Sequence, residues 1–187
     1  MSLSKNKGES FPERWLKEYV RLLRERPVIT KAITSGFITG LGQFLSQIIT
    51  REPQRTGHFN WRALASFTTF GFAFSGPLIH YFYTFLDQWV PPGTKYATIK
   101  KVLIDRFILA PPFLLMFFYV TAILDGQGHT VAAKKIQETF LPALLMNWRV
   151  WTVLQYINIK YVPREYRVLF GSAVALCWNI YLAIQRR

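Results

Sequence analysis

Four apolar stretches, each about as long as a membrane-crossing helix, alternate with polar segments along the chain. They cover residues 30–50, 63–89, 102–124 and 165–185. A helix needs about 20 predominantly apolar residues to cross the hydrocarbon core of a bilayer. The pattern therefore predicts an all-α integral membrane protein, a bundle of four main transmembrane helices that forms a single membrane domain over residues 1–187.

The segments before the first apolar stretch are polar or amphipathic. Residues 1–9 contain Ser, Lys, Asn and Gly, and are expected to form a disordered tail. Residues 10–27 begin with Ser10 and Glu13, which fit a capping box, and then predict an amphipathic helix. Its aromatic and leucine face lies opposite Arg and Lys, which favours a helix on an anionic membrane surface. The alternative is an ordinary helix that packs on its own protein.

Residues 130–162 form a semi-polar helical segment before the last apolar stretch. Asn147, Trp151 and Asn158 fall on one side of a helix, with Gln155 near its edge. Amides are expensive in hydrocarbon unless they meet partners or water. We therefore expect this side to be wet or hydrogen-bonded inside the membrane, with Arg149 as a further polar candidate.

Small and amide residues form a stripe along one face of the first apolar stretch. Gly36 and Gly40 are spaced as a G-x-x-x-G pair, and Gln43 and Gln47 continue the same face. Small residues let two helices approach closely, and glutamines then hydrogen-bond across the contact. The stripe predicts either helix packing or the lining of a pore.

The second and third apolar stretches carry further candidates. Gly76 and Pro77 predict a kinked helix, because proline removes a backbone donor and frees carbonyl groups. A histidine inside a membrane, here His80, is a functional candidate, and the alternative is a neutral His bonded to a neighbouring helix. Asp105 and Arg106 stand close to the expected interface, where snorkelling or local pairing explains them.

The net charge of +13 comes from Lys and Arg at the ends of apolar runs. Membrane proteins distribute cations in this way, so we expect a lipid bilayer as partner and no nucleic acid. The side that would hold both termini collects 14 of the 23 Lys and Arg, which favours two cytosolic termini. The sequence contains no catalytic, nucleotide-binding or metal-binding motif, so no enzyme, cofactor or metal is expected. The single cysteine, Cys177, excludes an internal disulfide.

Several motifs together resemble a known family of organelle membrane proteins. The motifs are Asn147-Trp-Arg-Val-Trp151, Tyr161-Val-Pro163, Trp178-Asn-Ile-Tyr-Leu182, Gly76-Pro77 before His80, and Asp105-Arg106 before Pro111. They are similar to the Mpv-type family of the peroxisomal and mitochondrial inner membranes. This resemblance implies four main helices, a pore for small water-soluble metabolites, and a homo-oligomer. Many relatives carry Asp where this chain has Gln43, so the resemblance implies that a carboxylate implicated in gating or selectivity elsewhere in the family is missing here.

Two functions remain open from the sequence. The first is a weakly selective channel for small solutes in the peroxisomal membrane, with the mitochondrial inner membrane as the alternative location. In that case the polar stripes line the path. The second is a non-conducting scaffold or lipid-interacting protein, in which the same stripes are seams between helices. The basic residues from Arg21 to Lys31 are a plausible targeting feature for the peroxisomal membrane-protein import receptor.

Overall fold

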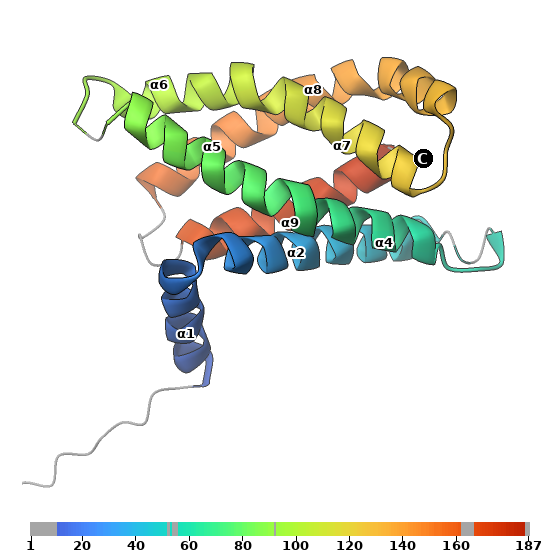
Figure 1. The fold of residues 1–187 in the computed structure, drawn as a ribbon, viewed down its shortest axis with the longest axis horizontal. Coiled ribbons are helices and arrows are strands. Elements are labelled where there is room, and N and C mark those ends of the chain that lie inside the picture. Colours follow the sequence, from blue (N-terminus) through green and yellow to red (C-terminus); the bar gives the residue numbers. More distant parts are fainter. Residues whose placement is uncertain (1–10, 52, 54–55, 92, 162–166, 186–187) are drawn as a thin grey trace, which may run out of the picture.

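The computed structural model describes residues 11–51, 53, 56–91, 93–161 and 167–185. Side chains at 11–13, 155, 158–160, 167–169 and 172 lie outside this description. Within these ranges the regular structure is entirely helical (Figure 1). The elements are α1 (Phe11–Glu25), α2 (Pro27–Ile49), α4 (Trp61–Phe70), η1 (Gly71–Ser75), α5 (Gly76–Trp89), α6 (Ala97–Ile104), η2 (Asp105–Leu109), α7 (Ala110–Leu124), α8 (His129–Lys160) and α9 (Arg167–Gln185).

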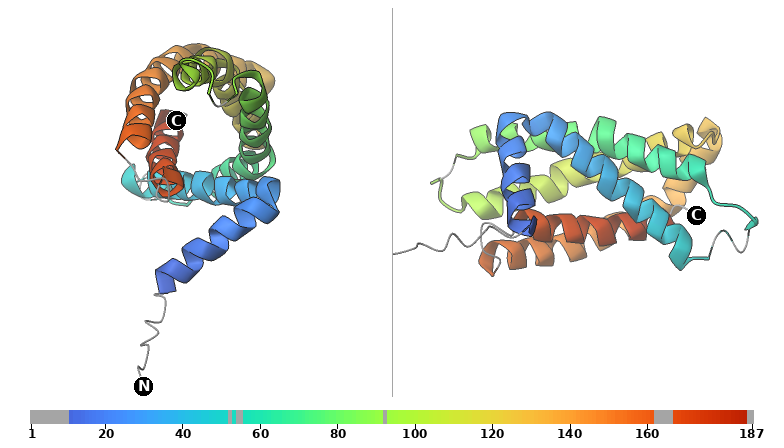
Figure 2. Two further views of the ribbon diagram at one scale, coloured as in Figure 1. Left: turned by 90° about the vertical axis from the view of Figure 1, so that its left-hand side faces the viewer. Right: turned by 90° about the horizontal axis from the view of Figure 1, so that it is seen from below.

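The helices form a closed ring. Helices α4, η1 and α5 form one continuous helix, and α6, η2 and α7 form another. Together with α2, α8 and α9 they make five antiparallel helices, each of which is called a pass of the ring. α2 contacts the α4–α5 pass, α4 contacts α7, α7 contacts α8, α8 contacts α9, and α9 contacts α2 again. An end-on view shows the ring, with α1 leaving it at one end and lying across the axes of the other helices (Figure 2). This placement of α1 suits a helix at the edge of a bilayer.

The bundle buries a set of polar side chains beside its apolar core and exposes many large apolar side chains. The buried set includes Thr39, Gln43, Ser46, Gln47, Ser66, Ser75, Asp105, Thr121, Asn147 and Asn179. The exposed set includes Ile33, Phe37, Ile48, Phe72, Leu78, Phe85, Leu103, Phe107, Ile108, Leu141 and Val153. A monomer in water rarely exposes so large a continuous apolar surface. The ring therefore presents an apolar surface outward and buries both apolar and polar side chains inside.

Two of the described helices are long and apolar enough to cross a membrane. They are Pro27–Ile49 and Ala97–Leu124, the latter made of α6, η2 and α7. A shorter apolar helix covers Ala173–Gln185. The helical bundle predicted from the sequence is thus present, while the crossing of the membrane by four main helices stays a prediction.

Close backbone contact fixes α2 against the α4–α5 pass. A Cβ atom placed on Gly76 would lie 2.5 Å from the Cα atom of Ala32 and 2.7 Å from its nitrogen. On α2, a Cβ at Gly36 would lie 3.2 Å from the carbonyl oxygen of Thr68, and one at Gly40 would collide with the Thr68 side chain. Glycines on both partners therefore allow the two helices to approach closely, as small residues do in membrane bundles.

A π-helical turn precedes the proline in each of two passes. In η1 the N–H of Gly76 donates to the carbonyl of Gly71, just before Pro77. In η2 the N–H of Ala110 donates to the carbonyl of Asp105, just before Pro111. A wider turn relieves the clash between a proline ring and the preceding carbonyls, so the irregularity expected at Gly76–Pro77 takes this form.

Helix α8 is a full pass of the bundle. It has 32 residues and runs through Pro142 without ending, which gives a length of about 48 Å at about 1.5 Å per residue. Because α8 adds a pass, α1 and the end of α9 lie at opposite ends of the bundle (Figure 1). The expectation from the sequence placed both termini on one side, because it counted 130–162 as a segment set apart from the crossings.

Candidate functional site: a cavity inside the helix ring

A cavity of about 380 Å³ lies inside the ring. Every pass contributes to its wall, and Tyr19 of α1 borders it as well. Its polar lining consists of Tyr19, Lys31, Thr34, Ser35, Thr39, Ser75, Tyr83, Asp105, Arg106, Asn147, Trp151 and Asn179. Pockets that hold small molecules usually measure about 300–1,000 Å³. The cavity is thus large enough for a small solute and offers it hydrogen-bonding groups.

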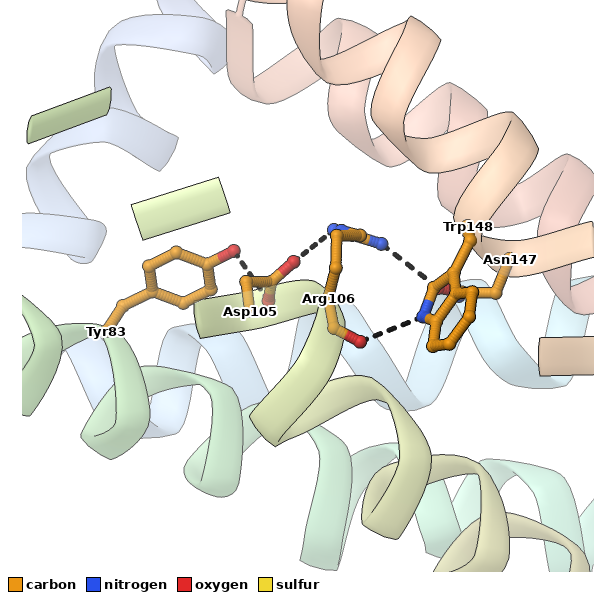
Figure 3. A network of polar contacts seen from close by, with 5 residues as sticks. All are labelled: Tyr83, Asp105, Arg106, Asn147 and Trp148. Carbon is orange, nitrogen blue, oxygen red and sulfur yellow. Dashed lines mark hydrogen bonds and ion pairs between the residues drawn. The ribbon is translucent and has the colours of Figure 1, made fainter. Parts of the chain in front are cut away.

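A chain of polar contacts crosses one wall of the cavity (Figure 3). The hydroxyl of Tyr83 donates to Oδ1 of Asp105 at 3.0 Å. The Arg106 guanidinium forms an ion pair with Oδ2 of Asp105. Its Nη1 donates to Oδ1 of Asn147 at 3.0 Å. The network thus ties α5, η2 and α8 together.

The ion pair between Asp105 and Arg106 is buried, so its stability depends on the hydrogen-bond partners of both side chains. The side chains of Asp105 and Arg106 are only 9% and 11% exposed. A buried charge is stable only when it is paired and hydrogen-bonded, which the network provides. Within the described part of the chain, Nε of Arg106 and Nε1 of Trp151 are buried without a hydrogen-bond partner.

A second cationic group borders the cavity on α2. Nζ of Lys31 lies 3.1 Å from Nδ1 of His80 on α5. The ion pair compensates the charge of Arg106 within the wall, whereas an imidazole carries no negative charge to compensate Lys31. The charged groups of the lining, Lys31, Asp105 and Arg106, therefore leave an excess of positive charge.

The predicted polar candidates divide between the cavity and the helix contacts. Asn147 and Trp151 line the cavity. Arg149 is exposed, and His80 makes its contact with Lys31 outside the lining. The side chains of Gln155 and Asn158 lie outside the described residues. The packing candidates Gly36, Gly40 and Gly76 lie along the contact between α2 and the α4–α5 pass, where Gly76 also borders the cavity. Pro77 stands in the first turn of α5.

The two glutamines lie in the other half of the bundle, away from the cavity. Nε2 of Gln47 donates to the carbonyl of Asn60 at 3.1 Å, and its Oε1 accepts from the N–H of Asn60 at 2.9 Å. The side chain of Asn60 in turn caps α4 by accepting from the N–H of Ala63. Gln47 thus anchors the start of α4 to α2. Gln43 is 3% exposed and its Oε1 lies 3.4 Å from the hydroxyl of Ser46.

Sequence reasoning missed the centre of the site. Asp105 and Arg106 were expected near the membrane interface, and the structure pairs them inside the ring. Tyr83, Lys31 and Asn179 were not selected either, although all three line the cavity. The available signal was an adjacent acid and base one helical turn before Pro111-Pro112, where a disturbed helix exposes carbonyl groups that need partners.

The fold and the site define a class of α-helical protein with an apolar outer surface and an internal cavity whose wall carries polar groups. The sequence profile of the Mpv17 / PMP22 family matches residues 122–183. Peroxisomal membrane protein 2 of Bos taurus is 45% identical over 92% of this chain and 89% of its own length. The mitochondrial inner membrane protein Mpv17 of Danio rerio is 33% identical over 89% of this chain and 94% of its own length.

A plant relative is similar along nearly the whole chain as well. Peroxisomal membrane protein PMP22 of Arabidopsis thaliana is 31% identical over 96% of this chain and 94% of its own length. The chain therefore belongs to the Mpv17 / PMP22 family, and the resemblance seen in its motifs is confirmed. No solved structure matches the chain.

Proposed function

We propose that this chain is a weakly selective channel that lets small water-soluble metabolites cross the peroxisomal membrane. The observation that carries the proposal is the cavity inside the ring, which is lined by all five passes and carries polar and charged groups on its wall. Amides and hydroxyls such as Asn147, Asn179 and Ser35 suit a pathway that discriminates little between solutes. In this proposal every pass of the ring crosses the bilayer.

The charge of the cavity wall favours small anions. Lys31 and Arg106 contribute positive charge, and Asp105 offsets only one of them. A cavity with low-dielectric walls concentrates counter-ions of the opposite sign. Organic acids of a few carbon atoms fit both the volume and the charge, so they are the proposed solute class.

Reconstitution into liposomes tests the channel. The purified chain should raise the flux of small organic acids above that of empty liposomes, and Lys31→Gln should lower the permeability ratio of anions to cations. Lys100→Gln, at an exposed position outside the cavity, is the matched control and should leave the ratio unchanged. Absence of flux in several independent preparations of the wild type would refute the proposal.

A second candidate is a non-conducting membrane scaffold. The half of the bundle around Gln47 favours it, because this glutamine is fully buried and satisfied by Asn60. In a scaffold the amide side chains form hydrogen bonds between packed helices, and the cavity holds water or lipid. Folded protein without flux, together with specific retention of lipid after purification, would favour the scaffold.

Location and partners are part of the same proposal. Relatives named for the peroxisomal membrane and for the mitochondrial inner membrane both match this chain. We propose the peroxisomal membrane, with import through the receptor for peroxisomal membrane proteins and assembly as a homo-oligomer. Imaging of a tagged chain against markers of both organelles tests the location, and chemical cross-linking in the membrane tests the assembly.

A further inference from the structure

We propose that an aromatic plug, made of Phe67, Phe70, Phe113 and Phe117, closes the cavity at one end and sets the largest solute that passes. The inference rests on the proposed channel function and names the residues that limit it. Phe67 and Phe70 come from α4, and Phe113 and Phe117 come from α7. α4 and α7 are neighbours in the helix ring and contact each other directly.

The rings of the plug interlock edge to face. The ring of Phe117 lies 5.1 Å from that of Phe67 and 5.1 Å from that of Phe70, with interplanar angles of 90° and 86°. The ring of Phe113 lies 5.7 Å from that of Phe70. Edge-to-face contact is a favoured geometry for aromatic pairs, so the cluster packs as one unit.

The cavity ends at this cluster. On α4 its lining ends at Phe70, on α7 at Phe117, and on α2 at Thr39. Beyond these positions the side chains of Phe67, Gln47 and Thr121 are fully buried. At the other end the lining includes Tyr19 and Lys31, which are both partly exposed. The cavity is therefore a vestibule that begins near α1 and stops at the plug.

An apolar constriction of this kind is a barrier to water and ions. Polar solutes lose their hydration against phenylalanine rings, and narrow hydrophobic segments of channels conduct poorly because they dewet. The polar wall around Arg106 admits and orients a solute, whereas the plug offers it no hydrogen bonds. Passage of a solute through one chain then requires the phenylalanine side chains to move apart. The gap between them sets the largest solute that passes.

The plug is tested by flux of a graded series of solutes, from small organic acids to sugars, through liposomes with purified protein. Phe70→Ala and Phe117→Ala should raise the flux of small solutes by about tenfold or more and admit larger ones. Phe72→Ala is the matched control, because Phe72 belongs to the same pass as Phe70 but is 51% exposed and does not line the cavity. It should keep the wild-type rate and size limit.

The outcomes separate the plug from the channel itself. If the wild type conducts and both alanine variants keep its rate and size limit, the plug is refuted and the channel function stands. If neither the wild type nor any variant exceeds empty liposomes, the channel function fails and the plug fails with it. Where an alanine variant does not fold, Phe70→Leu and Phe117→Leu keep an apolar core, remove the ring, and are judged by the same size limit.

Discussion

The indole N–H of Trp148 donates a hydrogen bond of 2.9 Å to the backbone carbonyl of Arg106. Within η2 the N–H of Ala110 is already used by Asp105, and the next residue, Pro111, has no N–H to offer. The Arg106 carbonyl therefore accepts its hydrogen bond from the Trp148 indole N–H instead of from a backbone N–H at position 111. Asn147, its neighbour on α8, accepts from the guanidinium of the same arginine. Two adjacent residues thus hold both the backbone and the side chain of Arg106.

Replacing Trp148 by phenylalanine tests this contact. Trp148→Phe keeps an aromatic ring but leaves the Arg106 carbonyl without its donor, which should cost about 1–3 kcal/mol of stability. We expect a lower melting temperature in detergent. Trp89→Phe alters a tryptophan that is 65% exposed, and it should melt like the wild type. Equal melting of the two variants would contradict the role of the indole N–H.

Removing the carboxylate of Asp105 should leave a buried cation. Asp105→Asn deprives Arg106 of its counter-charge, and loss of one partner from a buried pair costs about 3–5 kcal/mol. The double variant Asp105→Asn/Arg106→Gln removes both charges and should recover much of this loss. Melting temperatures of the wild type, both single variants and the double variant form the cycle. A purely additive result would show that the pair is not coupled.

Adding a methyl group at Gly76 should force two helices apart. The new Cβ would meet backbone atoms of Ala32 that cannot rotate away. Gly76→Ala should therefore destabilise the fold by about 1–3 kcal/mol or more, as overpacked cores do. At Gly128 an added Cβ meets nothing within 4 Å, so Gly128→Ala is the control. The fraction that remains monodisperse on size-exclusion chromatography after heating compares the two.

Two serines on α2 should differ in their access to water. Ser35 lines the cavity, whereas Ser46 is fully buried beyond the plug. With the exposed Cys177 first replaced by serine, Ser35→Cys should react with a water-soluble thiol reagent and Ser46→Cys should be protected. Both variants carry the same chemical change on the same helix, so mass-spectrometric labelling rates are directly comparable. Equal rates would mean that water reaches both halves of the ring.

Local patterns predicted the helices better than they predicted the site. The glycine at 76 marks a helix contact because spacing and small size are visible in the sequence, and the structure places Gly76 against Ala32. The pairing of Asp105 with Arg106, and of both with Tyr83 and Asn147, depends on how passes far apart in sequence face one another. Hydrophobic periodicity contains no such information. The helical segment predicted at 130–162 is present as α8, but its polar content did not indicate that it forms a full pass of the ring.

The uneven number of passes restricts how transport could work. Many carriers are built from two halves of equal size and opposite orientation, which rock around a central substrate. Five passes do not divide into two such halves, so the described part of one copy lacks the pair of rocking units that alternating access uses. A carrier of that design would need a second copy inserted upside down. A conduit that opens by movement of side chains needs only the single ring.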